Sequence, residues 1–223
     1  MELLAPAGSR QALTAAVQSG ADAVYLGGPQ FGARYSAENF TIEEMKTWVD
    51  YCHLYGVDVH VTVNTLVKEK EIESLKEYLK QLNKIGVDAL IVQDMGAAEI
   101  IKKTVPDMTL HASTQMTVTS LEGVKYLEDM GFSRVVLARE LSEKEIEHIC
   151  KNAKAEIEVF VHGAICMCYS GQCLMSSILG GRSGNRGRCA QPCRLPYDLL
   201  ENGKTVKSGY VLSPKDMALV NDL

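Results

Sequence analysis

The chain has 223 residues, of which 46% are hydrophobic and 23% charged, and its formal net charge is −5. That length suffices for one large domain with its own core, and the composition is ordinary for a soluble globular protein. No apolar run reaches the ~20 residues of a membrane-spanning helix, and the amino terminus does not read as a signal peptide. The net charge argues against non-specific binding to nucleic acid. We expect a cytoplasmic protein that does not bind DNA.

Short β-rich runs alternate with stretches of helical periodicity along the chain. The runs predict eight strands, at residues 2–5, 23–26, 58–63, 89–93, 109–113, 134–138, 157–162 and 209–212. The periodic stretches predict helices at residues 10–19, 42–55, 69–85, 97–104, 121–130 and 143–151. Several helices end at a glycine that is followed by a β-rich run, a pattern typical of βα units in a parallel sheet.

Eight strands in this length favour a TIM-type (β/α)8 barrel over residues 1–223, rather than an open, doubly wound sheet. No G-x-G-x-x-G follows the first strand, which also weighs against a dinucleotide-binding fold. The connection at 163–208 is far longer than usual for this fold, and we interpret it as a cysteine-rich insertion between strands seven and eight. Residues 213–216 predict the start of an eighth helix. Few residues follow, so we expect the chain to be truncated before a C-terminal domain.

This long connection contains five of the seven cysteines, namely Cys166, Cys168, Cys173, Cys189 and Cys193. Clustered cysteines in a reducing compartment indicate metal binding or chemistry more often than disulfides. A tetrahedral zinc site is one interpretation, although neither half contains C-x-x-C. An iron–sulfur cluster, which tolerates irregular spacing, is another, and buried unligated thiols are a third. For Cys52 and Cys150, which lie in helical patterns, we expect the third.

The same connection is basic, since no Asp or Glu occurs from Val159 to Tyr197. It contains Arg182, Arg186, Arg188 and Arg194, and glycines are interleaved with the first three. Glycine lets backbone approach a phosphate closely, and arginine binds phosphate or carboxylate through two N–H groups. The pattern predicts an anion site for RNA phosphate or a small acidic metabolite. A solvated, flexible loop is the alternative.

Polar side chains occur where predicted strands end, and barrel active sites are built there. These residues are Asn64, Gln93, Asp94, Ser113, Gln115, Arg139, Glu140 and His162. Each could instead cap a helix or anchor a loop, and Arg139 and Glu140 could form an ion pair with each other. His162 directly precedes the cysteine-rich connection, so it could bind a metal, transfer a proton or orient a substrate. We expect His111 to lie in the core.

Four stretches of the sequence resemble peptidase family U32, the collagenase-like proteases. They are E-V-F-V-H-G-A-I-C at 158–166, Y-S-G-Q-C-L-M-S at 169–176, G-R-C-A-Q-P-C-R at 187–194 and E-L-L-A-P-A-G at 2–8. The resemblance covers essentially the whole chain. The family is named for proteolysis, yet it includes proteins of oxygen-independent or prephenate-dependent hydroxylation. Their products are modified tRNA, rRNA and ubiquinone.

The resemblance implies a [4Fe–4S] cluster bound by four cysteines. Cys166, Cys173 and Cys189 match ligand positions, and Cys193 is the expected fourth, since 213–218 contains no cysteine. Cys168 matches none, and zinc would then be an artefact or an alternative. For the hydroxylation function, the candidate catalytic residues are His162, Arg139, Glu140 and Asn64, from their places at predicted strand ends. The candidate substrate-binding residues are Arg182, Arg186, Arg188, Arg194, Gln93, Ser113 and Gln115.

Three functions follow from these observations. The first is hydroxylation of an RNA base, with RNA as the partner and prephenate as a possible oxygen donor. The second is proteolysis, although the sequence contains neither H-E-x-x-H nor G-x-S-x-G and offers only a Cys166–His162 pair. The third is a non-catalytic iron–sulfur subunit that works with a second U32-family chain. The first is the function that we favour.

Overall fold

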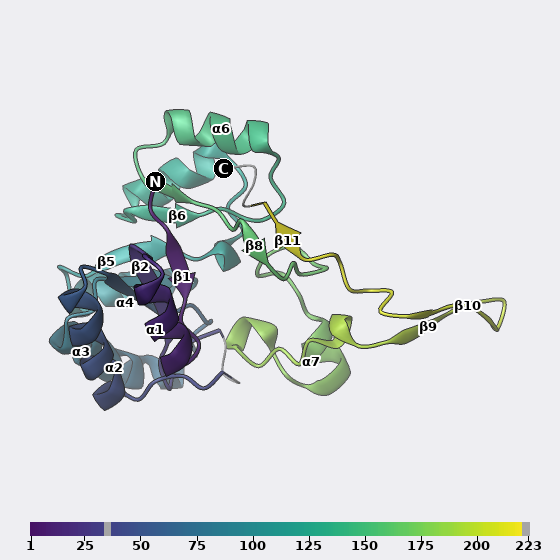
Figure 1. The fold of residues 1–223 in the computed structure, drawn as a ribbon, viewed down its shortest axis with the longest axis horizontal. Helices are drawn as coiled ribbons and strands as arrows, with labels where there is room; N and C mark the ends of the chain where they lie inside the picture. Colours follow the sequence, from purple (N-terminus) through teal and green to yellow (C-terminus); the bar gives the residue numbers. More distant parts are fainter. Residues whose placement is uncertain (34–36, 220–223) are drawn as a thin grey trace.

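The computed structural model describes residues 1–33 and 37–219, and its centre is a parallel sheet of seven strands in sequence order (Figure 1). The strands are β1 (Leu4–Pro6), β2 (Ala23–Gly27), β3 (Asp58–Val63), β4 (Ala89–Val92), β5 (Thr109–Ala112), β6 (Arg134–Val136) and β7 (Glu156–Glu158). The connecting helices are α1 (Arg10–Gln18), α2 (Ile42–Leu54), α3 (Ile72–Ile85), α4 (Met95–Thr104), α5 (Leu121–Asp129) and α6 (Glu143–Asn152). The predicted α/β class, the parallel sheet and these six helices are confirmed.

Shorter elements follow the sheet or lie in its connections. They are β8 (His162–Gly163), α7 (Met175–Gly180), β9 (Tyr197–Glu201), β10 (Lys204–Gly209), β11 (Met217–Ala218) and the 3-10 turns η1 (Glu69–Glu71), η2 (Thr114–Met116), η3 (Gly184–Arg186) and η4 (Pro192–Arg194). In the part of the chain that the structure describes, no helix is long and apolar enough to cross a membrane.

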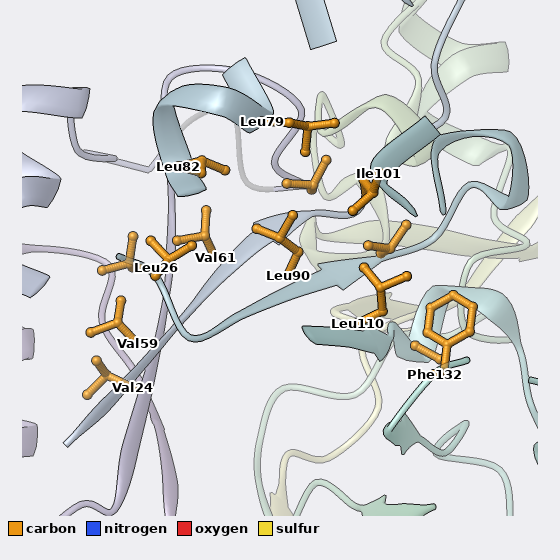
Figure 2. Packing of buried hydrophobic residues seen from close by; sticks show 14 of the residues in the cluster. Val24, Leu26, Val59, Val61, Leu79, Leu82, Leu90, Ile101, Leu110 and Phe132 are labelled. Carbon is orange, nitrogen blue, oxygen red and sulfur yellow. The ribbon is translucent and has the colours of Figure 1, made fainter. Parts of the chain in front are cut away.

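The apolar core lies between the sheet and its helices (Figure 2). Successive strand residues point to opposite faces, so Val59 and Val61 of β3 and Leu90 of β4 share the face that the helices cover. Leu82 of α3 and Ile101 of α4 pack onto that face, and both are fully buried. This packing leaves the other face of the sheet to the alternate strand residues, many of which are polar.

The face of the sheet opposite the helices is the inner face, and it curls around the buried guanidinium of Arg134 in β6. Its Nη1 and Nη2 donate to the two carboxylate oxygens of Glu2 at 2.6 Å each, and its Nε donates to Glu156 Oε2 at 2.8 Å. Glu2 precedes β1 and Glu156 begins β7, so Arg134 joins the two edges of the sheet. Glu158 also faces it, at 3.7 Å. The described sheet therefore curls as a half-barrel does.

The eighth barrel strand that we predicted at 209–212 is wrong. Asn202 and Gly203 both have positive φ (50° and 78°), which suits a tight hairpin turn. The turn pairs Gly209 with Tyr197 in an antiparallel ladder, and this hairpin, β9–β10, projects away from the sheet (Figure 1). Pairing two neighbouring strands across a short Asn-Gly turn costs less conformational entropy than bringing Gly209 to the distant edge of the parallel sheet.

Two neighbouring predictions also need correction. The residues predicted to begin an eighth helix, 213–216, are not helical, and β11 follows them and pairs with β8. Arg194 donates to the Ser213 hydroxyl at 2.6 Å, so tertiary contacts override the local helix-start signal. The predicted end of this helix, residues 220–223, lies outside the described residues. The strand predicted at 157–162 is divided into β7 and β8.

The buried carboxyl of Glu158 predicts a pH-dependent stability. Burial is the main reason why its pKa rises from an ordinary 4.5 to about 7, with Arg134 opposing that rise. Since the folded pKa exceeds the unfolded one, stability is full below about pH 4.5 and falls as the pH rises to about 7. We expect Glu158→Gln to lack this fall. Its unfolding free energy relative to wild type should increase by about 2–3 kcal/mol between those pH values, measured by urea denaturation. A pH-independent difference would contradict this account.

Candidate functional site

Three polar residues directly follow neighbouring strands at the carboxyl edge of the sheet. Asn64, Gln93 and Ser113 come after β3, β4 and β5, and the preceding residues are in register across these strands. Asn64 Oδ1 accepts from the Ala33 N–H at 2.9 Å, and Asn64 Nδ2 donates to Ser113 Oγ at 3.5 Å. Because side chains alternate between the two faces of a strand, these three lie on the inner face of the curled sheet. We call the carboxyl end of this inner face the mouth.

Two glutamines at the mouth have a buried side-chain amide oxygen that accepts no hydrogen bond from the described residues. Gln93 is 8% exposed, and its Oε1 accepts no hydrogen bond from the described residues. The same holds for Oε1 of Gln115, whose N–H donates to Ser113 Oγ at 3.2 Å. Asp94, the neighbour of Gln93, has a structural role instead, because it caps α4 at the Ala97 N–H and holds the Val67 N–H.

The cysteine-rich connection is attached to the mouth first at residues 170–172, beside β5 and β6. Ser170 is fully buried, and its hydroxyl accepts from Arg139 Nε at 3.3 Å and Nη2 at 3.2 Å. The Ser170 N–H donates to Glu140 Oε1 at 3.1 Å, and its carbonyl accepts from Thr117 Oγ1 at 2.5 Å. Arg139 and Glu140 thus bind the connection. Sequence reasoning missed Ser170, since only the tertiary fold buries it.

Glycine is required at the next position of this first attachment. Gly171 has a φ of +75°, and a Cβ placed on it would lie 2.1 Å from the carbonyl oxygen of Gln115. Only a residue without a side chain can lie this close to the η2 backbone. Next to it, Gln172 Nε2 donates to Thr117 Oγ1 at 2.9 Å.

A second attachment holds residues 184–187 on the β2 and β3 side of the mouth. Arg186 donates to both carboxylate oxygens of Glu71, at 2.6 and 3.0 Å, and to the Leu66 carbonyl at 2.7 Å. The hydrogen bond from Arg186 is the main reason why the pKa of Glu71 is lowered. Gly187, with a φ of +76°, packs so closely on the Gly32 carbonyl that a Cβ would lie 2.4 Å from it. The connection therefore crosses the mouth between opposite sides.

These attachments bring cysteine segments together. Cys173 and Cys189 each follow an attachment glycine by two residues. A Cβ placed on Gly184 would lie 3.7 Å from Cys189 Cβ and 3.9 Å from the Cys173 carbonyl oxygen. Arg194 Nη2 donates to the Ile165 carbonyl at 2.8 Å, which holds the chain next to Cys193 against the chain next to Cys166.

The thiols suit a soft metal by their chemistry. Burial, and then the neighbouring thiols of Cys173 and Cys166, raise the pKa of the Cys168 thiol. All seven cysteines are unpaired. Within the described ranges, no three Cys, His, Asp or Glu side chains are grouped so that they could hold one metal ion. Thiolate donors without carboxylates match iron–sulfur clusters or zinc, so the donor set fits either group.

The remaining predicted site residues lie apart from the mouth contacts described above. His162 is exposed in β8, where its backbone pairs with Ala218 of β11. Arg182 is exposed after α7. Arg194 is engaged with Ser213, with the Pro214 carbonyl at 3.3 Å and with Asp216 at 3.4 Å. Of the four arginines predicted to bind substrate, Arg186 and Arg194 therefore hold the chain itself.

Comparisons with known proteins extend over nearly the whole chain. The profile of peptidase family U32 matches residues 8–223. A 23S rRNA 5-hydroxycytidine synthase of Escherichia coli is 45% identical over 97% of this chain and 33% of its own length. The tRNA hydroxylation protein P1 of Bacillus subtilis is 39% identical, over 100% and 54%. A collagenase of Porphyromonas gingivalis is 33% identical, over 99% and 56%. The chain thus spans a third to about half of these relatives.

Solved structures support the architecture alone. A U32 peptidase superposes with a TM-score of 0.61 at 20% identity, over 74% of this chain and 70% of the other. A thiamine phosphate pyrophosphorylase of Pyrococcus furiosus gives a TM-score of 0.51 at 16% identity, over 74% and 76%.

Proposed function

Because the chain belongs to peptidase family U32, we propose that it is the iron–sulfur part of an enzyme that hydroxylates a base of tRNA or rRNA. The observation that carries this proposal is the attachment of the cysteine-rich connection across the mouth. It holds cysteines beside the end of the sheet where barrel enzymes bind their substrates. Relatives named for rRNA and tRNA hydroxylation, at 45% and 39% identity, support the same reaction.

The proposed cluster ligands are Cys166, Cys173, Cys189 and Cys193. A bound [4Fe–4S] cluster would supply one-electron transfer. The side chains around it have separate tasks in this proposal. Uncharged polar side chains at the mouth would bind the base. Arg182 and Arg188, in the basic part of the connection, would attract RNA phosphate or the carboxylates of prephenate as oxygen donor.

The described geometry offers less to proteolysis. A cysteine peptidase needs its thiol within hydrogen-bond reach of a base. Cys166 and His162 are both exposed, and no hydrogen bond joins them among the described residues. The relative named as a collagenase is the observation that keeps peptide cleavage as an outcome to test. A second U32-family subunit would be recognised by stoichiometric co-purification.

The test is the iron and acid-labile sulfide content of the full-length protein, purified without oxygen. We expect about four of each per chain, and their loss in alanine variants of Cys166, Cys173, Cys189 and Cys193. Cys150→Ala, at an exposed position on α6, is the matched control and should keep its iron. Cys168→Ala should also keep it. If Cys168→Ala loses iron while Cys193→Ala retains it, Cys168 replaces Cys193 in the ligand set.

The same variants are then scored for product. Total tRNA and rRNA from a deletion strain that carries each variant would be digested to nucleosides and analysed by mass spectrometry. A hydroxylated nucleoside should be present with wild type and Cys150→Ala, and absent with the ligand variants. Wild-type protein without iron, or with iron but without any product, would overturn the proposal. Cleavage of a collagen peptide that survives metal removal would establish the peptidase alternative instead.

A further inference from the structure

The polar groups at the mouth divide into those that hold the protein together and those that do not. Arg139 and Glu140 bind Ser170, and the Asn64 side chain bridges Ala33 and Ser113. Six buried side-chain atoms of the described residues have no hydrogen-bond partner, and two of them, the side-chain amide oxygens of Gln93 and Gln115, belong to residues that lie beyond the carboxyl ends of the neighbouring strands β4 and β5. Buried acceptors of this kind are rare in folded proteins, because an unmade hydrogen bond is unfavourable. Two such acceptors on residues that follow neighbouring strands suit a ligand that supplies donors.

The surroundings of the two glutamines indicate which chemistry this ligand has. Their neighbours at the same level, Asn64 and Ser113, are an amide and a hydroxyl, and neither carries a charge. A phosphate or carboxylate would need a cation here, and the guanidinium of Arg139 is already engaged with Ser170 and the Ala164 carbonyl, whereas a neutral group with N–H donors needs none. A side-chain amide offers one acceptor and two donors in a plane, which matches the hydrogen-bonding edge of a nucleobase.

We propose that Gln93 and Gln115 are specificity-determining residues that read the hydrogen-bonding edge of an unstacked RNA base in the mouth. The proposal rests on the proposed RNA function and names the residues that select the base. Phosphate contacts from the basic connection would add affinity without selecting a sequence. Loss of either amide should therefore weaken the recognition of the base and leave the binding of the RNA backbone unchanged.

The first experiment measures the affinity of full-length protein for RNA by fluorescence anisotropy. The probes are short single strands of cytidine, of uridine and of abasic ribose phosphate. Wild type should bind one base-containing strand more tightly than the abasic strand. Gln93→Leu and Gln115→Leu should each lose about 10-fold in affinity for the preferred strand and nothing for the abasic one. Gln11→Leu, on the exposed face of α1, is the control and should behave as wild type.

The second experiment separates reading of a base from a structural role. If Gln93 served the fold, Gln93→Met would lower the Tm. If its carbonyl is unpaired until a ligand binds, Gln93→Met should keep the Tm or raise it by about 2–4 °C. Weaker binding of the base together with an undiminished Tm is the expected pair of results. A lowered Tm would assign Gln93 to the core and overturn its proposed role.

The outcomes distinguish this inference from the proposed function. If wild type binds none of the strands, the RNA function fails and this inference fails with it. If wild type prefers a base and both leucine variants keep that preference, only the inference fails, and water would then be the partner of the two carbonyl oxygens. If the variants lose abasic and base-containing strands equally, the glutamines act on the backbone and the inference fails again.

Discussion

Replacing Arg134 with methionine is expected to lower the free energy of unfolding by about 2–3 kcal/mol, because it removes the cation that three carboxylates share, two of which remain accessible to water. The Arg134 side chain is only 9% exposed, and it binds Glu2, Glu156 and Glu158. Glu2 is separated from it by 132 residues, so the same change also removes the ionic contact between the two edges of the sheet. Burial of Arg134 makes this loss larger than that of a surface ion pair.

Urea denaturation, followed through the fluorescence of the single tryptophan, Trp48, measures this effect. Arg134→Lys is the matched control. It keeps the charge but cannot donate along two edges at once, and it should recover part of the lost stability. An Arg134→Met protein within about 1 kcal/mol of wild type would show that the carboxylates do not depend on this cation.

Replacing Gly171 with alanine is expected to lower the iron content and the RNA hydroxylation of the proposed function by at least 10-fold. The new Cβ would meet the backbone carbonyl of Gln115 at 2.1 Å, and a backbone atom in a 3-10 turn has little freedom to move. Residues 170–172 must then leave the mouth, and the contacts of Ser170 with Arg139 and Glu140 are lost. Because Cys173 lies two residues further on, its position is lost with them.

Gly181→Ala is the matched control for this prediction. Gly181 has a similar left-handed φ of +65°, but nothing lies within 4 Å of the Cβ that alanine would add. Gly181→Ala should therefore lose only about 1 kcal/mol of stability through backbone strain, and it should keep its iron. Limited proteolysis should cut the 163–208 connection of Gly171→Ala faster than that of Gly181→Ala. Equal iron content and equal cleavage rates would show that the first attachment does not position the thiols.

Local patterns in the sequence determine much of the fold. The strands from β2 to β6 and all six connecting helices were predicted within a few residues, because buried runs and glycine-terminated helices are short-range signals. The eighth strand failed for an equally local reason. Asn202-Gly203 is a strong hairpin turn, and this local signal outweighs the number of strands expected of a closed barrel.

For the candidate site, the sequence indicates where the polar residues lie relative to the strands but not which of them contact one another. Strand ends and the cysteine-rich connection indicated the mouth. Arg186 and Arg194 were predicted to bind substrate, yet Glu71 and the Ile165 carbonyl are what they bind. An arginine pattern predicts an anionic or carbonyl partner without saying whether that partner belongs to a ligand or to the chain. That choice depends on contacts between residues up to 120 positions apart.

In a chain that binds the proposed cluster, the two attachments of the cysteine-rich connection would impose an order on maturation. One attachment needs the turns after β5 and β6, and the other needs the turns after β2 and β3. Neither surface exists until those strands have assembled, so the segments that carry Cys173 and Cys189 meet only on a folded sheet. A metal delivered to the nascent chain would find scattered thiols. Loading of the proposed cluster would therefore report that the sheet has folded, and a chain with a defective sheet would stay without metal and open to degradation.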